Sequence, residues 1–297
     1  MPSRSVARRL IAARLTRGRR PKSGIESGGQ TGPVRRRYRT IFMSDIHLGT
    51  RGCQASLVLD FLDHHDSDRL YLVGDILDGW QLKKSWHWPQ THDDVVQKVL
   101  VKGRNGTKII YLPGNHDEFL RDYAGIHFGG VEVIDQTIHD LADGRRLLVL
   151  HGDQFDIVVR YAPWLAVLGS GAYVAALSVN TVVNRVRRRL GWDYWSLSAW
   201  AKAKVKNAMR HIGNFEEALA SEARRRGVDG VVCGHIHHAS IHENDGFIYV
   251  NSGDWVESCT AIAEHHDGRL EIIRWTAASG ASADPVGDKV RLPEAAE

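Results

Sequence analysis

Residue types that bind metal ions gather in five short motifs of this 297-residue chain. The motifs are Asp45-Ile46-His47, Gly74-Asp75-Ile76-Leu77-Asp78, Gly114-Asn115-His116-Asp117, His151-Gly152-Asp153 and Gly234-His235-Ile236-His237. Each motif directly follows an apolar run that is typical of a buried strand, and a parallel sheet places the C-terminal ends of its strands along one rim. We therefore expect side chains from distant parts of the chain to meet at one metal centre.

The candidate donors are oxygen and nitrogen atoms, which suit Mn, Mg, Fe or Zn ions and disfavour a thiolate site. Asp45 and His47 flank one residue, and alternate residues of an extended segment point the same way, so both can reach one ion. Two ions roughly 4 Å apart that share a carboxylate account for the whole donor set better than one ion does. Such ions ionise a bridging water near neutral pH and bind phosphoryl oxygens. The full set is Asp45, His47, Asp75, Asn115, His151, His235 and His237.

The motifs resemble those of the calcineurin-like metallophosphoesterases, which read D-x-H, G-D-x-x-D, G-N-H-D, H-G-D and G-H-x-H in this order. The resemblance implies two divalent ions, with Mn²⁺ as the expected metal, bridged by Asp75. It also implies that His116 is the catalytic histidine beside the phosphoryl group and that Asp78 orients and polarises it. The implied ligands are Asp45, His47 and His237 at one ion, and Asn115, His151 and His235 at the other.

Within that family, the chain is similar to the bacterial UDP-2,3-diacylglucosamine hydrolases. The similarity lies in Ser44 to Gly49, in Gly74 to Trp80, and in an insertion between the last two motifs. That branch cleaves the pyrophosphate of UDP-2,3-diacylglucosamine at the inner membrane, in lipid A biosynthesis, to UMP and an acylated sugar 1-phosphate. His116 stands where the branch has Arg, and Ile236 to Ala239 where it reads T-H-R-P, so we expect a paralogous subgroup.

Strand-like runs alternate with segments of helical spacing, which favours an α/β core. We expect strands at 38–43, 70–73, 108–112, 146–150, 230–233, 247–250 and 270–275, and helices at 54–65 and 93–102. The family resemblance implies a four-layer αββα sandwich with a helical cap insertion. The expected domain covers 38–275, with the cap at 156–227 and disordered tails at 1–37 and 276–297.

The insertion contains an uncharged run from Tyr161 to Asn184. A membrane span there would put His151 and His235 on opposite sides of a bilayer, so a helical hairpin is the better interpretation. Arginines and an aromatic group follow it. Either the cap only packs on the core, or its apolar side accepts acyl chains and its Arg/Trp rim contacts phospholipid headgroups.

The segment from Trp80 to His92 is expected to be a loop. It contains Trp86, Trp88, Lys83 and Lys84. These side chains suit stacking on a base or a lipid, and they equally suit an ordinary surface loop anchored by its tryptophans.

The basic residues are concentrated in one part of the chain. Residues 1–39 hold twelve Lys or Arg and one acid, so the remainder is net acidic and no nucleic-acid partner is expected. Three cysteines without a CxxC pair indicate a reducing compartment. We expect a cytoplasmic enzyme, peripheral on the inner membrane through its cap, that acts on a lipid-linked phosphoester or pyrophosphate.

Two alternatives to that function stay open. The same site suits a phosphodiesterase or phosphatase for a nucleotide, phospholipid or protein. The other alternative is a non-catalytic, membrane-associated scaffold, whose signature would be the loss of a ligand or of His116. All of these residues are present.

Overall fold

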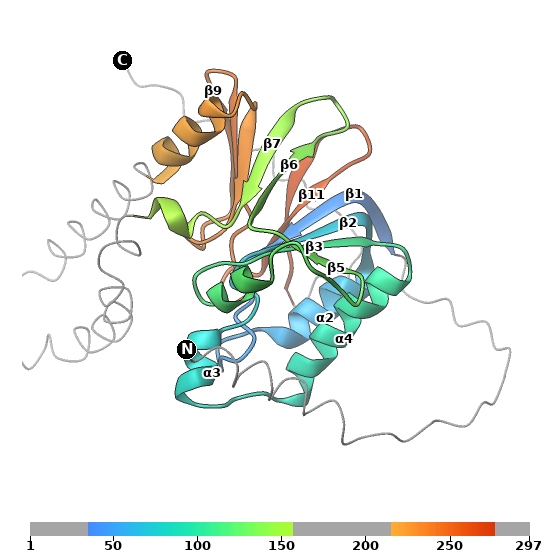
Figure 1. Cartoon of the computed structure of the whole chain (residues 1–297). Helices are drawn as coiled ribbons and strands as arrows, with labels where there is room; N and C mark the ends of the chain where they lie inside the picture. Colours follow the sequence, from blue (N-terminus) through green and yellow to red (C-terminus); the bar gives the residue numbers. More distant parts are fainter. Residues whose placement is uncertain (1–34, 157–214, 277–297) are drawn as a thin grey trace, which may run out of the picture.

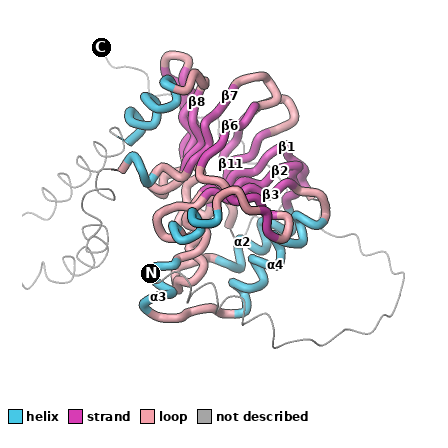
Figure 2. Tube along the Cα trace, in the orientation of Figure 1, coloured by secondary structure: helices cyan, strands magenta, loops and turns pink. Residues whose placement is uncertain are grey.

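The computed structural model describes residues 35–156 and 215–276. Within these ranges two β-sheets pack face to face, and helices cover the outer face of each sheet (Figure 1 and Figure 2). This is the four-layer αββα arrangement expected from the sequence. Most of the predicted cap, 157–214, lies outside the described residues, as do 1–34 and 277–297 of the predicted tails.

The first sheet has seven strands in the order β12-β11-β1-β2-β3-β5-β4. Strands β1, β2 and β3 run parallel, so their C-terminal ends lie at one edge of the sheet. The strands of this sheet are β1 (Arg36–Met43), β2 (His65–Val73), β3 (Lys108–Leu112), β4 (His127–Phe128), β5 (Val131–Val133), β11 (Thr260–Glu264) and β12 (Leu270–Arg274).

The second sheet has five strands in the order β6-β7-β8-β10-β9. Strands β7 and β8 are parallel. The motif-bearing strands therefore divide between two sheets, three in the first and two in the second, whereas the simplest expectation was the rim of one sheet. The strands of this sheet are β6 (Gln136–Asp140), β7 (Arg146–Leu150), β8 (Gly230–Cys233), β9 (Ser240–Asn244) and β10 (Phe247–Asn251).

Three apolar clusters hold the four layers together. Helices α2 (Ala55–His64) and α4 (Gln90–Arg104) bury Val58, Phe61 and Val95 against the first sheet. Alternate residues of the strands, such as Phe42, Ile110, Val149 and Val232, fill the space between the two sheets. The helix at 215–225 places Phe215, Leu219 and Ala223 on the outer face of the second sheet. Burial on both faces explains why the central strands are continuous apolar runs.

Several predicted boundaries were wrong at one end. β1 begins at Arg36 rather than at Tyr38, because Arg36 and Arg37 pair with the early residues of β2 and Arg37 forms a 2.6 Å ion pair with Asp68. β2 begins at His65, five residues before the predicted strand, and α4 begins at Gln90, directly after Pro89.

The expected loop from Trp80 to His92 was also partly wrong, because α3 (Gly79–Lys84) forms there. Its first turn is capped by the carboxylate of Asp78, which accepts a hydrogen bond from the Gln81 amide at 2.7 Å. A side-chain acceptor at this position stabilises a helix by about 1 kcal/mol. Two short 3-10 helices, η1 (Glu118–Tyr123) and η2 (Asp153–Phe155), complete the described elements.

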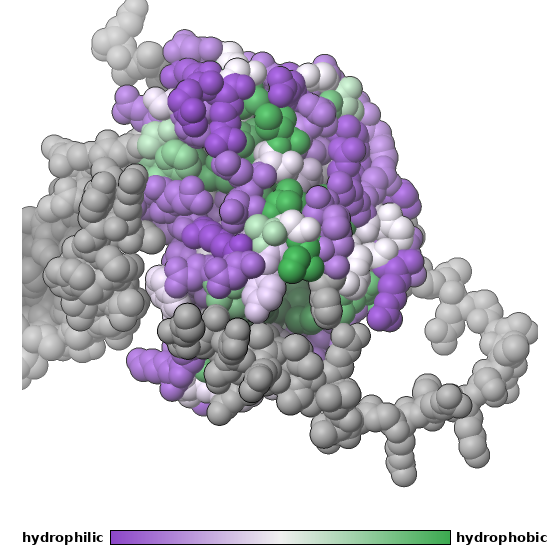
Figure 3. Space-filling model, viewed as in Figure 1, coloured by the Kyte–Doolittle hydropathy of each residue, from purple (hydrophilic) through white to green (hydrophobic). Residues whose placement is uncertain are grey.

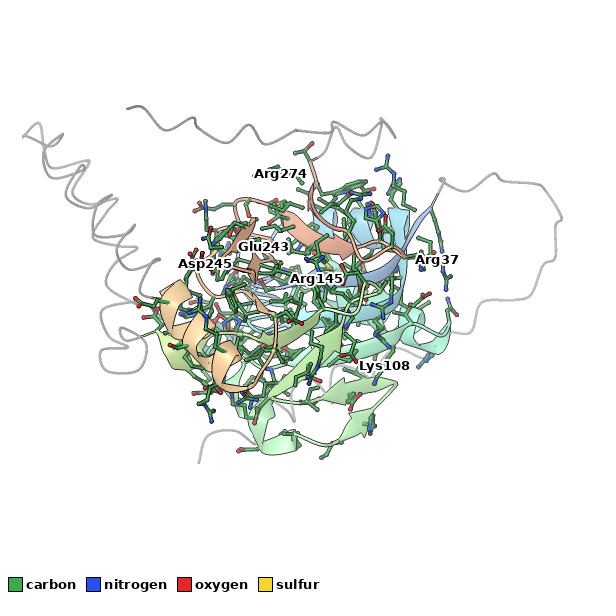
Figure 4. The ribbon with its side chains drawn as sticks, turned by 90° about the horizontal axis from the view of Figure 1, so that it is seen from above. Arg37, Lys108, Arg145, Glu243, Asp245 and Arg274 are labelled. Atoms are coloured by element: carbon green, nitrogen blue, oxygen red, sulfur yellow. The ribbon has the colours of Figure 1, made fainter. Side chains whose placement is uncertain are left out.

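Figure 3 shows a mainly hydrophilic face, with apolar residues in separate patches. Figure 4 labels six charged residues, among them Arg145 and Glu243, whose side chains approach each other to 3.8 Å. None of the helices in the described ranges is long and apolar enough to cross a membrane.

Candidate metal centre

All five motifs begin where a strand ends, and the structure brings their side chains together. Donor atoms form three overlapping groups, and within each group they lie within 4.8 Å of one another. Asp75 belongs to two of these groups and so connects one end of the site to the other. The groups are Asp45, His47 and His237; His47, Asp75 and His116; and Asp75, His151 and His235.

The backbone at the donors is unusual. Asp45, His47, Asp75, His235 and His237 all have positive φ angles, between 51° and 72°. For residues with a side chain this left-handed conformation costs about 1–3 kcal/mol and is concentrated at functional sites. Asp45 and His47 do approach each other, at 3.9 Å between Oδ1 and Nε2, but through a left-handed turn rather than the extended segment that we expected.

Three motif glycines are required by the packing of the donors themselves. A Cβ atom on Gly74 would lie 2.2 Å from His151 Nδ1, and one on Gly114 would lie 2.3 Å from Asp75 Oδ1. At Gly234 the same atom would lie 2.6 Å from Asp45 Oδ2. Each glycine therefore lets one motif approach the donor of another, because a residue with a side chain would clash with that donor.

Eight buried side-chain atoms in the described part of the chain have no hydrogen-bond partner, and four of them belong to the expected ligands: Asp45 Oδ1, His47 Nε2, Asn115 Oδ1 and His151 Nε2. A buried polar atom without a hydrogen-bond partner costs about 1–3 kcal/mol, and such atoms are rare in folded proteins. Here four such atoms come from three of the five motifs. The donor set thus fits divalent metal ions, since the oxygens have lone pairs to offer and an imidazole nitrogen has one once its proton is lost.

The electrostatics also favour positive charge at this site. Burial opposes ionisation of Asp45, but His237, His151 and His47 lower its pKa below the ordinary value. Burial likewise opposes protonation of His151, yet Asp75 and Asp45 raise its pKa to about 10. Asp45 raises the pKa of His237 to about 9 in the same way. The carboxylates therefore attract cations, whether protons or metal ions.

His116 and Asp78 lie beside the donors as the sequence predicted. The Nδ1 atom of His116 is 3.0 Å from Asp78 Oδ2, and its Nε2 is 4.0 Å from Asp75 Oδ2. Burial lowers the pKa of His116, but the two carboxylates outweigh burial and raise it. The indole of Trp80 packs on the imidazole of His116, with ring centres 4.2 Å apart. Asp78 also lies 3.3 Å from Nδ1 of His47, so one carboxylate orients two imidazoles.

Asp117 lies outside the expected ligand set but supports the loops that carry it. Its buried carboxylate accepts hydrogen bonds from the amides of Gly114, Asp75, Ile76 and Leu77 and from the Tyr111 hydroxyl. It thereby joins the G-N-H-D turn to the loop that carries Asp75. The available signal was its place in a glycine turn, where Asp side chains commonly accept nearby backbone amides.

Comparison with known proteins agrees with this geometry. A sequence model described as "Calcineurin-like phosphoesterase" matches residues 38–239, a range that contains all five motifs. A UDP-2,3-diacylglucosamine hydrolase of Haemophilus influenzae (strain PittGG) is 24% identical over 239 residues, covering 74% of this chain and 92% of that protein. A protein of the same name from Xanthomonas oryzae pv. oryzae (strain PXO99A) is 25% identical over 243 residues, covering 77% and 96%.

Solved structures of similar shape include a Vps29 single mutant from Entamoeba histolytica. It superimposes with a TM-score of 0.39 at 11% identity, covering 80% of this chain and 99% of that chain. A structure described as a novel archaeal phosphodiesterase gives a TM-score of 0.37 at 12% identity, covering 79% and 98%.

Proposed function

The chain belongs to the calcineurin-like phosphoesterase family, and on that premise we propose that it hydrolyses a pyrophosphate or phosphodiester bond at a centre of two divalent ions. Family membership makes the chain a metal-dependent hydrolase of phosphoester or diphosphate bonds. The observation that carries the dinuclear proposal is that four buried donor atoms without a hydrogen-bond partner belong to the motifs whose side chains group around Asp75.

We assign the donors to two ions on either side of Asp75. Two of the donor groups support the assignment, one that contains Asp45 and one that contains His151. The two groups are adjacent, because Nε2 of His47 in the first lies 4.0 Å from Oδ2 of Asp75 in the second. When bound, two divalent ions, with Mn²⁺ as our first choice, ionise a water near neutral pH and neutralise charge on the phosphoryl oxygens. The proposed ligands are Asp45, His47 and His237 for one ion, Asn115, His151 and His235 for the other, and Asp75 for both.

The proposed role of His116 is to give a proton to the departing oxygen of the substrate. Its raised pKa favours the protonated ring, and Asp78 lies 3.0 Å from Nδ1, so that Nε2 is left for the substrate. Trp80 on one side of the ring and His47 on another, at 4.6 Å between ring centres, limit its rotation.

For the substrate we propose UDP-2,3-diacylglucosamine or a similar lipid-linked nucleotide, cleaved to UMP and an acylated sugar 1-phosphate at the cytoplasmic face of the inner membrane. The support is the name of the relatives, which are 22–25% identical over most of the chain. The predicted acyl-binding part of the cap lies outside the described residues, so the proposal of a lipid-linked substrate rests on those relatives.

The test is product analysis with purified protein and Mn²⁺. UDP-2,3-diacylglucosamine is supplied, and UMP and the acylated sugar 1-phosphate are followed by mass spectrometry. We expect both products from the wild type and from Asn105→Ala, a surface control, but neither from Asn115→Ala. Hydrolysis of bis-p-nitrophenyl phosphate without these products would keep the metal centre and reject the acyl-sugar substrate.

A further inference from the structure

The chain after His151 turns back toward the metal centre. Gly152 adopts a φ of 111° and η2 follows, and the amide of Asp156 then donates to the carbonyl of Asp153 at 3.2 Å. Arg121 holds this turn in place, because its guanidinium donates to both carboxylate oxygens of Asp153, at 2.8 and 2.9 Å. The ordered turn that follows the H-G-D motif thus extends as far as Asp156.

At the end of this turn a second carboxylate meets a proposed ligand. Oδ2 of Asp156 lies 2.9 Å from Nε2 of His235, and each side chain is 8% exposed. Among the described residues, the donor group at this ion contains Asp75, His151 and His235 but not Asp156. Asp156 thus contacts the imidazole of His235 without belonging to that donor group.

We propose that Asp156 is a positioning residue for His235, an inference that rests on the proposed ligand role of that histidine. Asp156 accepts a hydrogen bond from Nε2–H, which fixes the tautomer of the ring and leaves the lone pair of Nδ1 for the metal. A carboxylate that accepts a hydrogen bond from a metal-binding imidazole also increases the basicity of the ring. Removing such a carboxylate typically weakens metal affinity by about 10–100-fold.

Neighbouring rings support this orientation. Phe215 lies 5.9 Å from the imidazole of His235 between ring centres, and His151 lies 5.2 Å away at a steep angle of 78°. The amide of His235 donates to Asp45 Oδ2 at 3.0 Å, so its backbone is fixed as well. Packing limits the plane of the ring, and the hydrogen bond to Asp156 decides which nitrogen faces the ion.

The experiment measures metal binding by the full-length protein without any substrate. Metal-free wild type, Asp156→Ala and Asp156→Asn are titrated with Mn²⁺, and free Mn²⁺ is counted by electron paramagnetic resonance. We expect Asp156→Ala to weaken the binding of one of the two ions by about 10–100-fold and to leave the binding of the other unchanged. Asp156→Asn keeps an acceptor oxygen, so its loss of metal affinity should be smaller. Gln154→Ala, which changes an exposed side chain in the same turn, is the matched control and should keep both affinities.

A second comparison separates positioning from direct ligation. If Asp156 acts only through His235, then Asp156→Ala adds no further loss in a His235→Ala background, whereas a direct ligand would add one and overturn the proposal. Wild-type affinity for both ions in Asp156→Ala would also overturn it. If His235→Ala itself kept both ions, the ligand assignment would fail together with this inference. Circular dichroism of each metal-free variant identifies any that does not fold, and Asp156→Asn then serves as the test.

Discussion

Asp117 offers the most direct test of how the centre is built, because its role does not depend on metal or substrate. One carboxylate oxygen accepts the amides of Gly114 and Asp75, and the other accepts the amides of Ile76 and Leu77 and the Tyr111 hydroxyl. The change Asp117→Asn replaces one acceptor oxygen by an NH₂ group. In either orientation of the amide, at least two backbone N–H groups then face a donor.

The magnitude follows from the number of amides that lose their acceptor. Each buried N–H without a partner costs about 1–3 kcal/mol, which gives about 2–6 kcal/mol for two. An opposing effect is the loss of the buried charge, since burial and the neighbouring Asp75 raise the pKa of Asp117 and so disfavour its ionised form. We therefore expect a net destabilisation in the lower part of that range, about 2–4 kcal/mol.

The assay is urea unfolding of the metal-free protein, followed by tryptophan fluorescence. Asp122→Asn is the matched control, because this exposed aspartate lies on η1, which begins directly after Asp117, and its change should stay within about 0.5 kcal/mol. A free energy of unfolding for Asp117→Asn equal to that of the control would refute the reasoning. It would mean that the loop carrying Asp75 does not depend on this carboxylate for its conformation.

Three further outcomes are expected. Asp75→Asn should abolish hydrolysis of bis-p-nitrophenyl phosphate and lower the bound Mn²⁺, since it removes the charge shared by the two donor groups; full activity would contradict the dinuclear assignment. His116→Ala should lower kcat by about 10²–10⁴ while the bound metal stays unchanged, because its proposed role is proton transfer; an unchanged kcat would exclude that role. Burial lowers the pKa of His65 to about 4, so unfolding takes up a proton between pH 6.5 and 4, and stability falls as the pH drops through that window. His65→Phe should remove about 2 kcal/mol of this loss, measured by urea unfolding at pH 7 and pH 4.5; an unchanged pH slope would show that His65 is not buried in its neutral form.

The central strands could be predicted from the sequence because both faces of each are buried. The run from Lys108 to Leu112 is bounded by a glycine turn on one side and by Pro113 on the other, and β3 has these limits. Strands β7 and β8 also begin and end where the sequence predicted. Strands such as β9, with its polar sequence at a sheet edge, gave no such signal because pairing with β10 holds them in place rather than apolar burial.

The gathering of the donors was also predictable, but the way the chain achieves it was not. Asp78 was assigned one role, beside His116, while in the structure it also caps α3 and contacts His47. Asp156 gave no signal because its partner, His235, is 79 residues away. A sequence pattern reveals which residues follow strands, whereas hydrogen bonds between loops depend on how the two sheets pack.

The left-handed backbone of the donors has a consequence for protein engineering. A thermostabilisation campaign commonly replaces residues of positive φ by Gly or Asn, since either relieves about 1 kcal/mol or more of strain. In this chain such a search would select His47, Asp75 and His237 among its first targets. Variants chosen for melting temperature alone would therefore lose the residues proposed to hold the metal. Selection for stability and selection for activity act in opposite directions at these positions.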